Sequence, residues 1–136
     1  MNLDEFLGQV QHRAQLATTG QALSATRATL QVLGQRLAGG APGDLAAELP
    51  NELREYLPDP GPGESFDLDE FFRRVSASEG VDLPVSIHHA RVVIEVLQEA
   101  ISPGAVSKVL DQLPDEYRPL FTSGSQGQMD TSVGRG

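Results

Sequence analysis

Two stretches of the sequence share one apolar spacing, and this spacing limits the possible fold more than any other feature. Between residues 85 and 101, apolar side chains recur at alternating steps of three and four, at Ile87, Ala90, Ile94, Leu97 and Ile101. Between residues 21 and 37 the same steps recur 64 positions earlier, at Leu23, Thr26, Leu30, Leu33 and Leu37. Such steps place side chains on one face of an α-helix. We therefore expect two long helices in matching register.

The later stretch carries a second apolar row beside the first, formed by Val93, Val96 and Ala100. A helix that is apolar around much of its circumference is buried inside a globular protein. At about 1.5 Å per residue it would be roughly 25 Å long, which is close to the width of a small domain. The pattern predicts a central helix, present twice, with shorter helices around it.

The segments that flank the two long stretches also match each other. Three apolar residues of the opening segment return 65 positions later, so that Leu3, Phe6 and Val10 correspond to Leu68, Phe71 and Val75. The motif LPNELR at 49–54 returns as LPDEYR at 113–118, again 64 positions later. The small change of offset falls in a loop, where length changes are tolerated. The sequence therefore predicts an internal duplication.

The expected fold class is all-α, with two pseudo-twofold repeats of about four helices each packed into one compact helical domain. The first repeat covers residues 1–57 and the second covers residues 66–121. Between them, PDPGPGES at 58–65 holds three prolines and two glycines, which predicts a stiff, extended connector. Residues 122–136 are rich in Gly and Ser and nearly free of large apolar groups, so we expect a disordered tail.

Polar residues mark the expected helix starts. Asn2 with Glu5, and Asp67 with Glu70, have the spacing of helix caps, in which a side chain accepts a hydrogen bond from the first turn. The shorter segments are expected as helices over 44–49, 51–57 and 105–113, with a break between helices at 18–20 and a turn over 39–43.

Composition excludes several classes of protein. The 136 residues carry a net charge of −9, and their basic side chains form no stripe, which argues against direct nucleic-acid binding. There is no Cys, so disulfides and thiolate metal sites are excluded and a reducing compartment is expected. The opening MNLDEF is acidic where a signal peptide is basic, and no apolar stretch approaches the ~18 residues of a membrane span. We expect a cytoplasmic protein with no membrane partner.

The matched blocks together resemble a known family. LDEFLGQV, DLDEFFRRV, ATRATLQVLGQRL, GDLAAELPNELREYL and DQLPDEYRPLF are similar to the bacterial family catalogued as domain of unknown function 2267. The resemblance covers residues 2–121, and departs slightly at Thr29, where an aliphatic residue is usual. Because the family is uncharacterised, the resemblance implies an all-helical, internally duplicated fold and supplies no catalytic residues and no cofactor.

Two pairs of basic residues are candidates for chemistry. His88 and His89 are neighbours, and neighbours on a helix point about 100° apart, so their rings do not readily bind one metal ion. We interpret them as a solvent-side His88 beside a partly buried His89. Arg27 and Arg91 occupy matching positions among apolar residues. Each is expected to pair with an acid from a neighbouring helix.

A group of acidic residues at 67–70 has a simpler explanation than metal binding. Asp67, Asp69 and Glu70 resemble the start of a calcium loop, but Phe72 and Ser78 stand where that loop requires Gly and Glu. Helix capping accounts for these acids, and we expect no metal and no cofactor.

The repeated LP[ND]ExR motif supplies Glu52, Arg54, Glu116 and Arg118. Their charges suit the first turn of a helix. The alternative is a pair of matching docking points for a partner.

The leading hypothesis is a non-enzymatic module that acts through contacts with an unidentified protein partner, and a homodimer stays open. One alternative is a small-molecule-binding protein or enzyme with a pocket between the two repeats, with Arg27, Arg91, His88 and His89 as its candidate residues. A second alternative is an acidic decoy for a nucleic-acid-binding protein.

Overall fold

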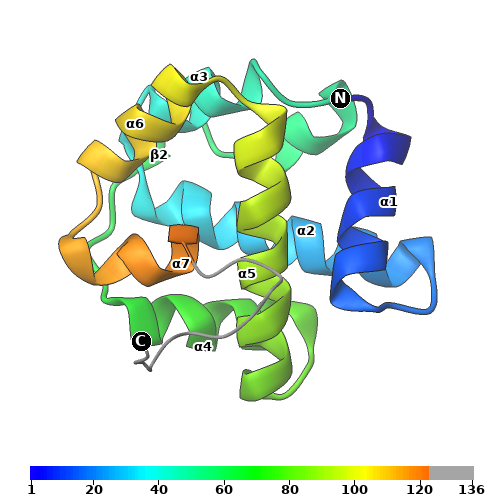
Figure 1. The fold of residues 1–136 in the computed structure, drawn as a ribbon. Coiled ribbons are helices and arrows are strands. Elements are labelled where there is room, and N and C mark those ends of the chain that lie inside the picture. The colour runs from blue at the N-terminus through cyan, green and yellow to red at the C-terminus, as the bar shows by residue number, and fades with distance from the viewer. Residues whose placement is uncertain (123–136) are drawn as a thin grey trace.

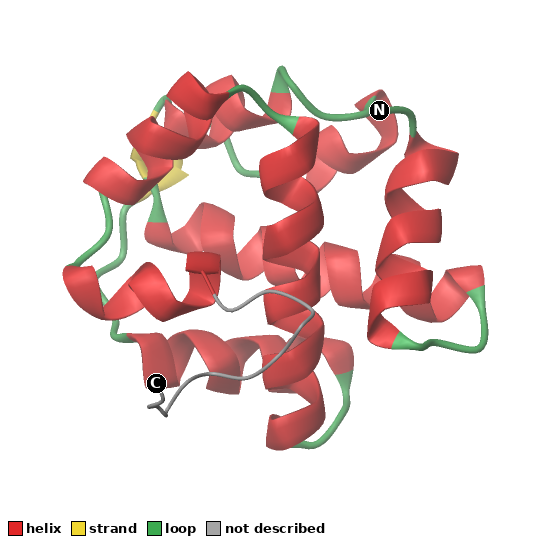
Figure 2. Cartoon of the chain, viewed as in Figure 1, coloured by secondary structure: helices red, strands yellow, loops and turns green. Residues whose placement is uncertain are grey.

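A computed structural model describes residues 1–122 of the chain, and almost every element in this range is a helix (Figure 2). The α-helices are α1 (Leu3–Ala14), α2 (Thr19–Arg36), α3 (Ala41–Ala46), α4 (Leu68–Glu79), α5 (Leu83–Ala100), α6 (Pro103–Asp111) and α7 (Arg118–Thr122). Two 3-10 helices are η1 (Asn51–Tyr56) and η2 (Asp115–Tyr117), and η2 runs directly into α7. Two short strands are β1 (Ala38–Gly39) and β2 (Gly61–Pro62). The predicted all-α class is confirmed.

The two long helices form the centre of the molecule. Helix α5 runs through the middle of Figure 1, and α2 crosses behind it and contacts it, as the apolar rows predict. Both contain 18 residues. Helices α1 and α4, with 12 residues each, pack against both long helices. The long helices bury most of their predicted faces: Leu30 and Ile94 are fully buried, whereas Leu23 and Ile87, near the helix starts, are partly buried.

The predicted caps at the starts of α1 and α4 are present. The backbone N–H of Glu5 donates to the side chain of Asn2 at 2.8 Å, and the Glu5 carboxylate accepts from the N–H of Asn2 at 2.9 Å. The N–H of Glu70 donates to the Asp67 carboxylate at 2.8 Å. These bonds satisfy N–H groups that a helix start leaves without intrahelical acceptors.

Helix α2 begins slightly earlier than predicted. The hydroxyl of Thr18 accepts from the N–H of Gln21 at 3.1 Å, and the Gln21 side chain accepts from the N–H of Thr18 at 3.2 Å. This reciprocal cap makes Thr18 the helix boundary, so the predicted break at 18–20 is wrong for Thr19 and Gly20, which belong to α2.

The short helices also differ from the prediction. Helix α3 starts at Ala41 and not at residue 44, because Pro42 lies in its first turn, where the fixed φ of proline suits a helix. Part of the predicted turn over 39–43 is therefore helix. Pro103 plays the same part in α6. After Pro50 the chain forms the 3-10 helix η1.

The connector, 58–65, runs against the carboxyl end of α2. Strand β2 pairs antiparallel with β1, with Gly61 opposite Gly39. The N–H of Gly63 donates to the carbonyl of Leu37 at 3.1 Å, and the N–H of Glu64 donates to the carbonyl of Gln35 at 3.0 Å. A side chain at residue 61 would place its Cβ 2.3 Å from the Leu37 carbonyl oxygen, so only glycine permits this approach. The connector is extended, as predicted, and is also hydrogen-bonded in place.

Directly after the connector, the backbone carbonyl of Phe66 accepts hydrogen bonds from one side chain earlier in the chain and one later in it. The carbonyl of Phe66 accepts from the hydroxyl of Tyr117 at 2.7 Å and from Nε of Arg36 at 3.0 Å. The Arg36 guanidinium also lies over the Tyr117 ring, 5.5 Å from its centroid. Tyr117 is fully buried, and this burial raises the pKa of its hydroxyl above the ordinary value.

The expectations on the internal duplication, the tail and a membrane span have separate outcomes. The internal duplication and the domain boundaries stay predictions. The predicted tail, 122–136, lies outside the described residues except for Thr122, which ends α7. Among residues 1–122, no helix combines the length and the hydrophobicity that a membrane span requires.

Candidate functional site

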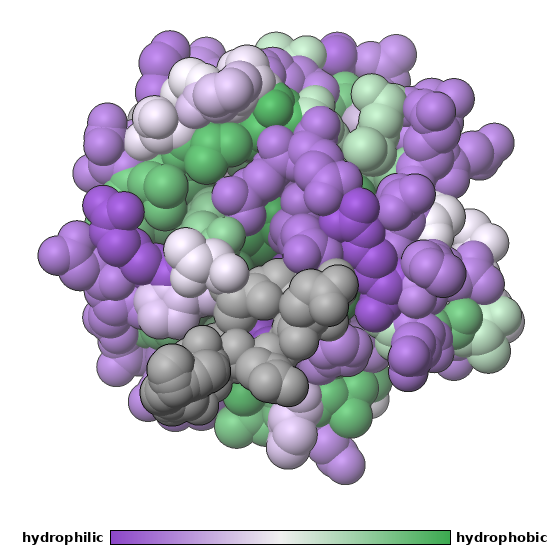
Figure 3. All heavy atoms as spheres, viewed as in Figure 1, coloured by the Kyte–Doolittle hydropathy of each residue, from purple (hydrophilic) through white to green (hydrophobic). Residues whose placement is uncertain are grey.

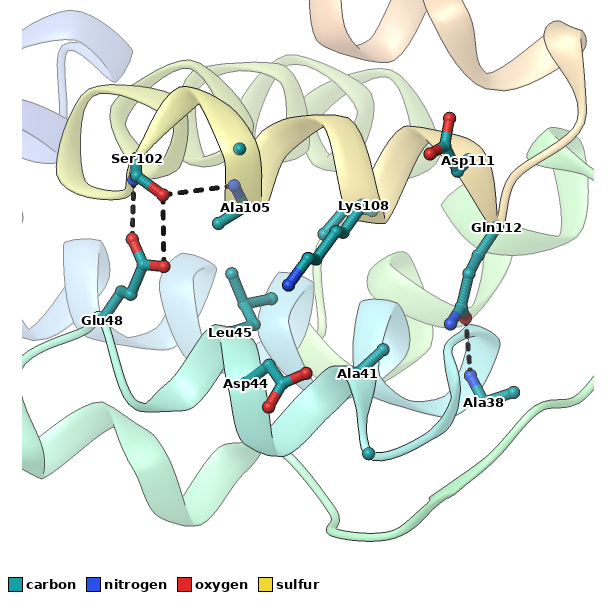
Figure 4. A pocket seen from close by; sticks show the side chains of 13 residues that line it. Ala38, Ala41, Asp44, Leu45, Glu48, Ser102, Ala105, Lys108, Asp111 and Gln112 are labelled. Atoms are coloured by element: carbon teal, nitrogen blue, oxygen red, sulfur yellow. Dashed lines mark hydrogen bonds between the residues drawn. The ribbon is translucent and has the colours of Figure 1, made fainter.

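Helices α3 and α6 lie side by side and border a cavity of about 520 Å³ (Figures 1 and 4). The buried side chains of Leu45 and Val109 form its apolar wall, and the partly buried Ala41 and Ala105 extend this wall. Figure 3 shows hydrophobic residues gathered on the visible face where Figure 1 places α6.

Hydrogen bonds between the two sides of this cavity fix its width (Figure 4). At one end, the N–H of Ser102 donates to the Glu48 carboxylate at 2.6 Å, and the Ser102 hydroxyl donates to the same carboxylate at 3.2 Å. At the other end, the N–H of Ala38 donates to the side chain of Gln112 at 2.9 Å. Gln112 stands 64 positions after Glu48, and Ser102 stands 64 positions after Ala38. Each of the two contacts therefore repeats the other.

The remaining lining residues follow the same correspondence. Six residues from the first half of the chain each have a counterpart 64 positions later: Ala38, Gly40, Ala41, Asp44, Leu45 and Glu48 match Ser102, Gly104, Ala105, Lys108, Val109 and Gln112. Asp111 also lines the cavity and stands outside these pairs. The cavity thus lies between two segments of the chain whose residues stand 64 positions apart.

The charged residues of the cavity are unevenly distributed. Asp44 and Lys108 are exposed, occupy matching positions and have opposite charges; Figure 4 shows Lys108 extending from α6 towards α3. Glu48 and Asp111 add two more acids. The cavity therefore has an apolar wall and a rim in which three acids face one base.

A second, smaller cavity of about 360 Å³ contains a buried His–Glu pair. Nδ1 of His89 lies 2.5 Å from Oε2 of Glu79, and the two side chains are 8% and 4% exposed. The other oxygen of Glu79, Oε1, is buried and has no hydrogen-bond partner among the described residues. The pair joins the end of α4 to α5, and the α1–α2 turn closes the cavity from the other side.

His88 does not line this cavity. Its ring is half-buried, and its centroid lies 6.1 Å from that of His89. Burial lowers the pKa of His88 below the ordinary value, and the neighbouring His89 and Arg91 lower it further. The two histidines therefore face different surroundings, as their adjacent positions on a helix require.

The pocket expected from four basic residues is not assembled. Of Arg27, Arg91, His88 and His89, only His89 lines either of the two cavities described above. The guanidinium of Arg27 donates to Gln31 of its own helix at 3.3 Å and, within residues 1–122, makes no ion pair with an acid of a neighbouring helix, contrary to the expectation. Arg91 is 8% exposed, and burial lowers its pKa.

The repeated motif makes different contacts in its two copies. Arg54 donates to the carbonyls of Ala46 and Ala47 at 3.0 and 3.3 Å, at the end of α3. Arg118 lies 3.5 Å from Asp115 on the surface.

The two glutamates of the motif differ as well. Both are exposed, but Glu116 accepts from the N–H of Leu68 at 3.2 Å, whereas the Glu52 side chain makes no hydrogen bond within residues 1–122. A pair of matching docking points at these four residues stays a prediction.

Sequence reasoning missed the polar residues of the larger cavity, Asp44, Glu48, Lys108 and Gln112. They occupy exposed positions in or just after short helices, where polar residues are common and carry no signal of their own. The signal that identifies them is the offset of 64 positions, which relates each of the four to another residue of the cavity.

The fold and its cavities define an all-α protein with a cavity between α3 and α6 that is large enough to hold a ligand. Within residues 1–122, no group of three or more His, Asp or Glu side chains is placed to hold a metal ion. A family model described as uncharacterized conserved protein (DUF2267) matches residues 3–120. The chain therefore belongs to this family, as the sequence blocks had indicated. No curated protein matches the sequence.

Proposed function

We propose that the protein is a non-enzymatic binding module that docks a short segment of a partner protein in the cavity between α3 and α6. The observation that carries this proposal is the cavity itself, which has an apolar wall, an acidic rim and a hydrogen-bonded contact at each end.

The lining residues indicate the chemistry of the segment. Leu45 and Val109 offer an apolar surface for one apolar side chain of the partner, and the volume of about 520 Å³ lies within the usual range of binding cavities. The rim carries three acids and one base, and the whole chain has a net charge of −9. A segment with an apolar residue flanked by basic residues complements both features.

The cavity is also held in shape before anything binds. The bonds from Ser102 to Glu48 and from Ala38 to Gln112 connect its two sides, so little ordering is needed on docking. Asp44 and Lys108 differ in charge at matching positions, which favours one direction of the bound segment over the other.

Fluorescent peptides test the proposal directly. The probes contain one Leu or Phe flanked by Lys, and the reference peptides carry Glu in place of Lys. We expect the Lys peptides to bind more tightly to the wild-type protein in fluorescence anisotropy. Ala105→Trp fills the cavity and abolishes binding, whereas Ser107→Trp, on an exposed position of α6 outside the cavity, leaves binding unchanged. Asp44→Lys weakens binding about tenfold, which corresponds to about 1.4 kcal/mol.

Two results would assign the cavity differently. If no peptide binds but small molecules raise the melting temperature of the wild-type protein and not of Ala105→Trp, the cavity takes a small molecule. If the protein sediments as a dimer that Ala105→Trp dissociates, the occupant is a second copy of the chain.

A further inference from the structure

The buried pair of His89 and Glu79 has a geometry that a purely structural contact does not require. Its hydrogen bond joins Nδ1 of the imidazole to Oε2 of the carboxylate, so Nε2 and Oε1 take no part in it. Oε1 is buried without a hydrogen-bond partner among the described residues, and Nε2 is not among such buried atoms. Since His89 lines the cavity of about 360 Å³, Nε2 is the atom of the pair that a ligand reaches.

The hydrogen bond also sets the chemistry of Nε2. A carboxylate only accepts hydrogen bonds, so the neutral imidazole carries its proton on Nδ1 and presents a lone pair at Nε2. Behind the ring, the Glu79 carboxylate is 4% exposed, and a negative charge in such surroundings is only weakly screened. With a neutral imidazole, the cavity therefore offers an acceptor atom with the Glu79 carboxylate behind it.

The other described residues that line the cavity do not neutralise the negative charge of Glu79. Thr18 and Gln21 are occupied by the cap of α2, in which each accepts from the backbone of the other. Leu16 and Val81 are apolar, and Ser24 contributes a hydroxyl, which carries no charge. Among the described residues, no lysine or arginine lines the cavity.

The same position in the first half of the chain lacks these groups. The residue 64 positions before His89 is Ala25, and the positions 64 and 65 before Glu79 are Gln15 and Ala14. Packing of the shared framework therefore does not need a His–Glu pair, because the first half achieves it with small or neutral side chains.

We propose that this cavity binds a small organic cation with a primary ammonium group. One N–H of the ammonium donates to Nε2 of His89, and a second donates to the hydroxyl of Ser24. The buried Glu79 balances the positive charge through the ring, and a short apolar chain contacts Leu16 and Val81. Bound ligand and carboxylate together are neutral, which lowers the cost of the buried negative charge.

The test uses n-butylammonium as the probe and NMR titration of the full chain as the measurement, with 1-butanol and butyrate as neutral and anionic references. We expect saturable shifts at His89, Leu16 and Val81 with the ammonium only. Glu79→Gln retains a hydrogen-bond acceptor for Nδ1 and removes the charge, so affinity falls at least about tenfold. Asp69→Asn removes an exposed carboxylate of the same helix that lines neither cavity, and it serves as the matched control, with unchanged affinity.

Several results would overturn the proposal. These are the absence of saturable shifts at His89, equal binding of 1-butanol, and an equal loss of affinity in Asp69→Asn and Glu79→Gln. If Glu79→Gln does not fold, Ser24→Ala replaces it. Loss of one hydrogen bond then weakens ammonium binding severalfold, and unchanged binding in that variant contradicts the proposed pose.

Discussion

The two halves of the chain, residues 1–57 and 66–121, have similar frameworks but different polar residues. Helices α1 and α4 have 12 residues each, α2 and α5 have 18 each, and each shorter helix packs on both long ones. At matching positions, however, Asp44 corresponds to Lys108, and Ala25 corresponds to His89. Both proposed binding sites involve such differences. We infer that similar packing maintains the fold and that binding chemistry resides where the halves diverge.

A second difference concerns what covers each long helix. Gly34 of α2 lies against Pro58 of the connector, where a Cβ would come within 2.6 Å of the proline ring. The matching residue of α5 is Gln98, which donates to the carbonyl of Phe121 in α7 at 2.9 Å. The same helical position therefore accommodates close backbone packing in one half and a side-chain hydrogen bond in the other.

The largest expected effects come from matching core positions. Leu30 and Ile94 are both fully excluded from solvent, and they occupy equivalent places in the two long helices. Leu30→Ala and Ile94→Ala each remove a buried side chain and should lower the free energy of unfolding by about 2–5 kcal/mol. Urea denaturation followed by circular dichroism measures this change.

Both variants should unfold in one transition, because the two helices share one core. Two separate transitions, with each variant affecting only one of them, would show that the halves are independent domains.

The next effect distinguishes the two ways of covering the long helices. Gly34→Ala forces Pro58 to move and should cost about 1–3 kcal/mol, as overpacking of a core does. Gln98→Ala only removes hydrogen bonds and should cost about 1 kcal/mol. Thermal unfolding of the two variants tests the comparison, and a larger loss for Gln98→Ala contradicts it.

The sequence predicts the shared framework well and the differences poorly, for a physical reason. Apolar periodicity reports which face of a helix is buried, and Leu30 and Ile94 are buried as their spacing requires. The caps at Asn2 and Asp67 were also predictable, because each depends on residues three positions apart.

The sites depend on long-range contacts that no local pattern encodes. Glu79 and His89 lie on different helices, and Glu48 and Ser102 are 54 residues apart. Only knowledge of how α3 meets α6 places Asp44 and Lys108 on the same cavity. The position of α3 itself was missed, because Pro42 starts that helix within a stretch that reads as a turn.

A smaller effect separates the two copies of the LP[ND]ExR motif. Arg54→Ala removes hydrogen bonds to the carbonyls of Ala46 and Ala47 and should cost about 1 kcal/mol. Arg118→Ala removes an exposed contact with Asp115 and should cost about 0.5 kcal/mol or less. Urea denaturation of both variants checks this, and equal losses would indicate that the motif works identically in both halves.

The smallest effect concerns pH, and it uses the matching positions Ser24 and His88. Burial holds the pKa of His88 below its ordinary value of 6.5, with further lowering by His89 and Arg91. The unfolded chain therefore binds this proton more readily than the folded chain does. Stability from this group is present above about pH 6.5 and is lost as the pH falls.

His88→Ser gives the second half the residue of the first and removes this dependence. The free energy of unfolding of the wild-type protein should fall more steeply between about pH 7 and pH 5 than that of the variant. Urea denaturation at a series of pH values measures both slopes. Equal slopes would mean that His88 is as well solvated in the folded chain as in the unfolded chain, and that this difference between the halves has no electrostatic consequence.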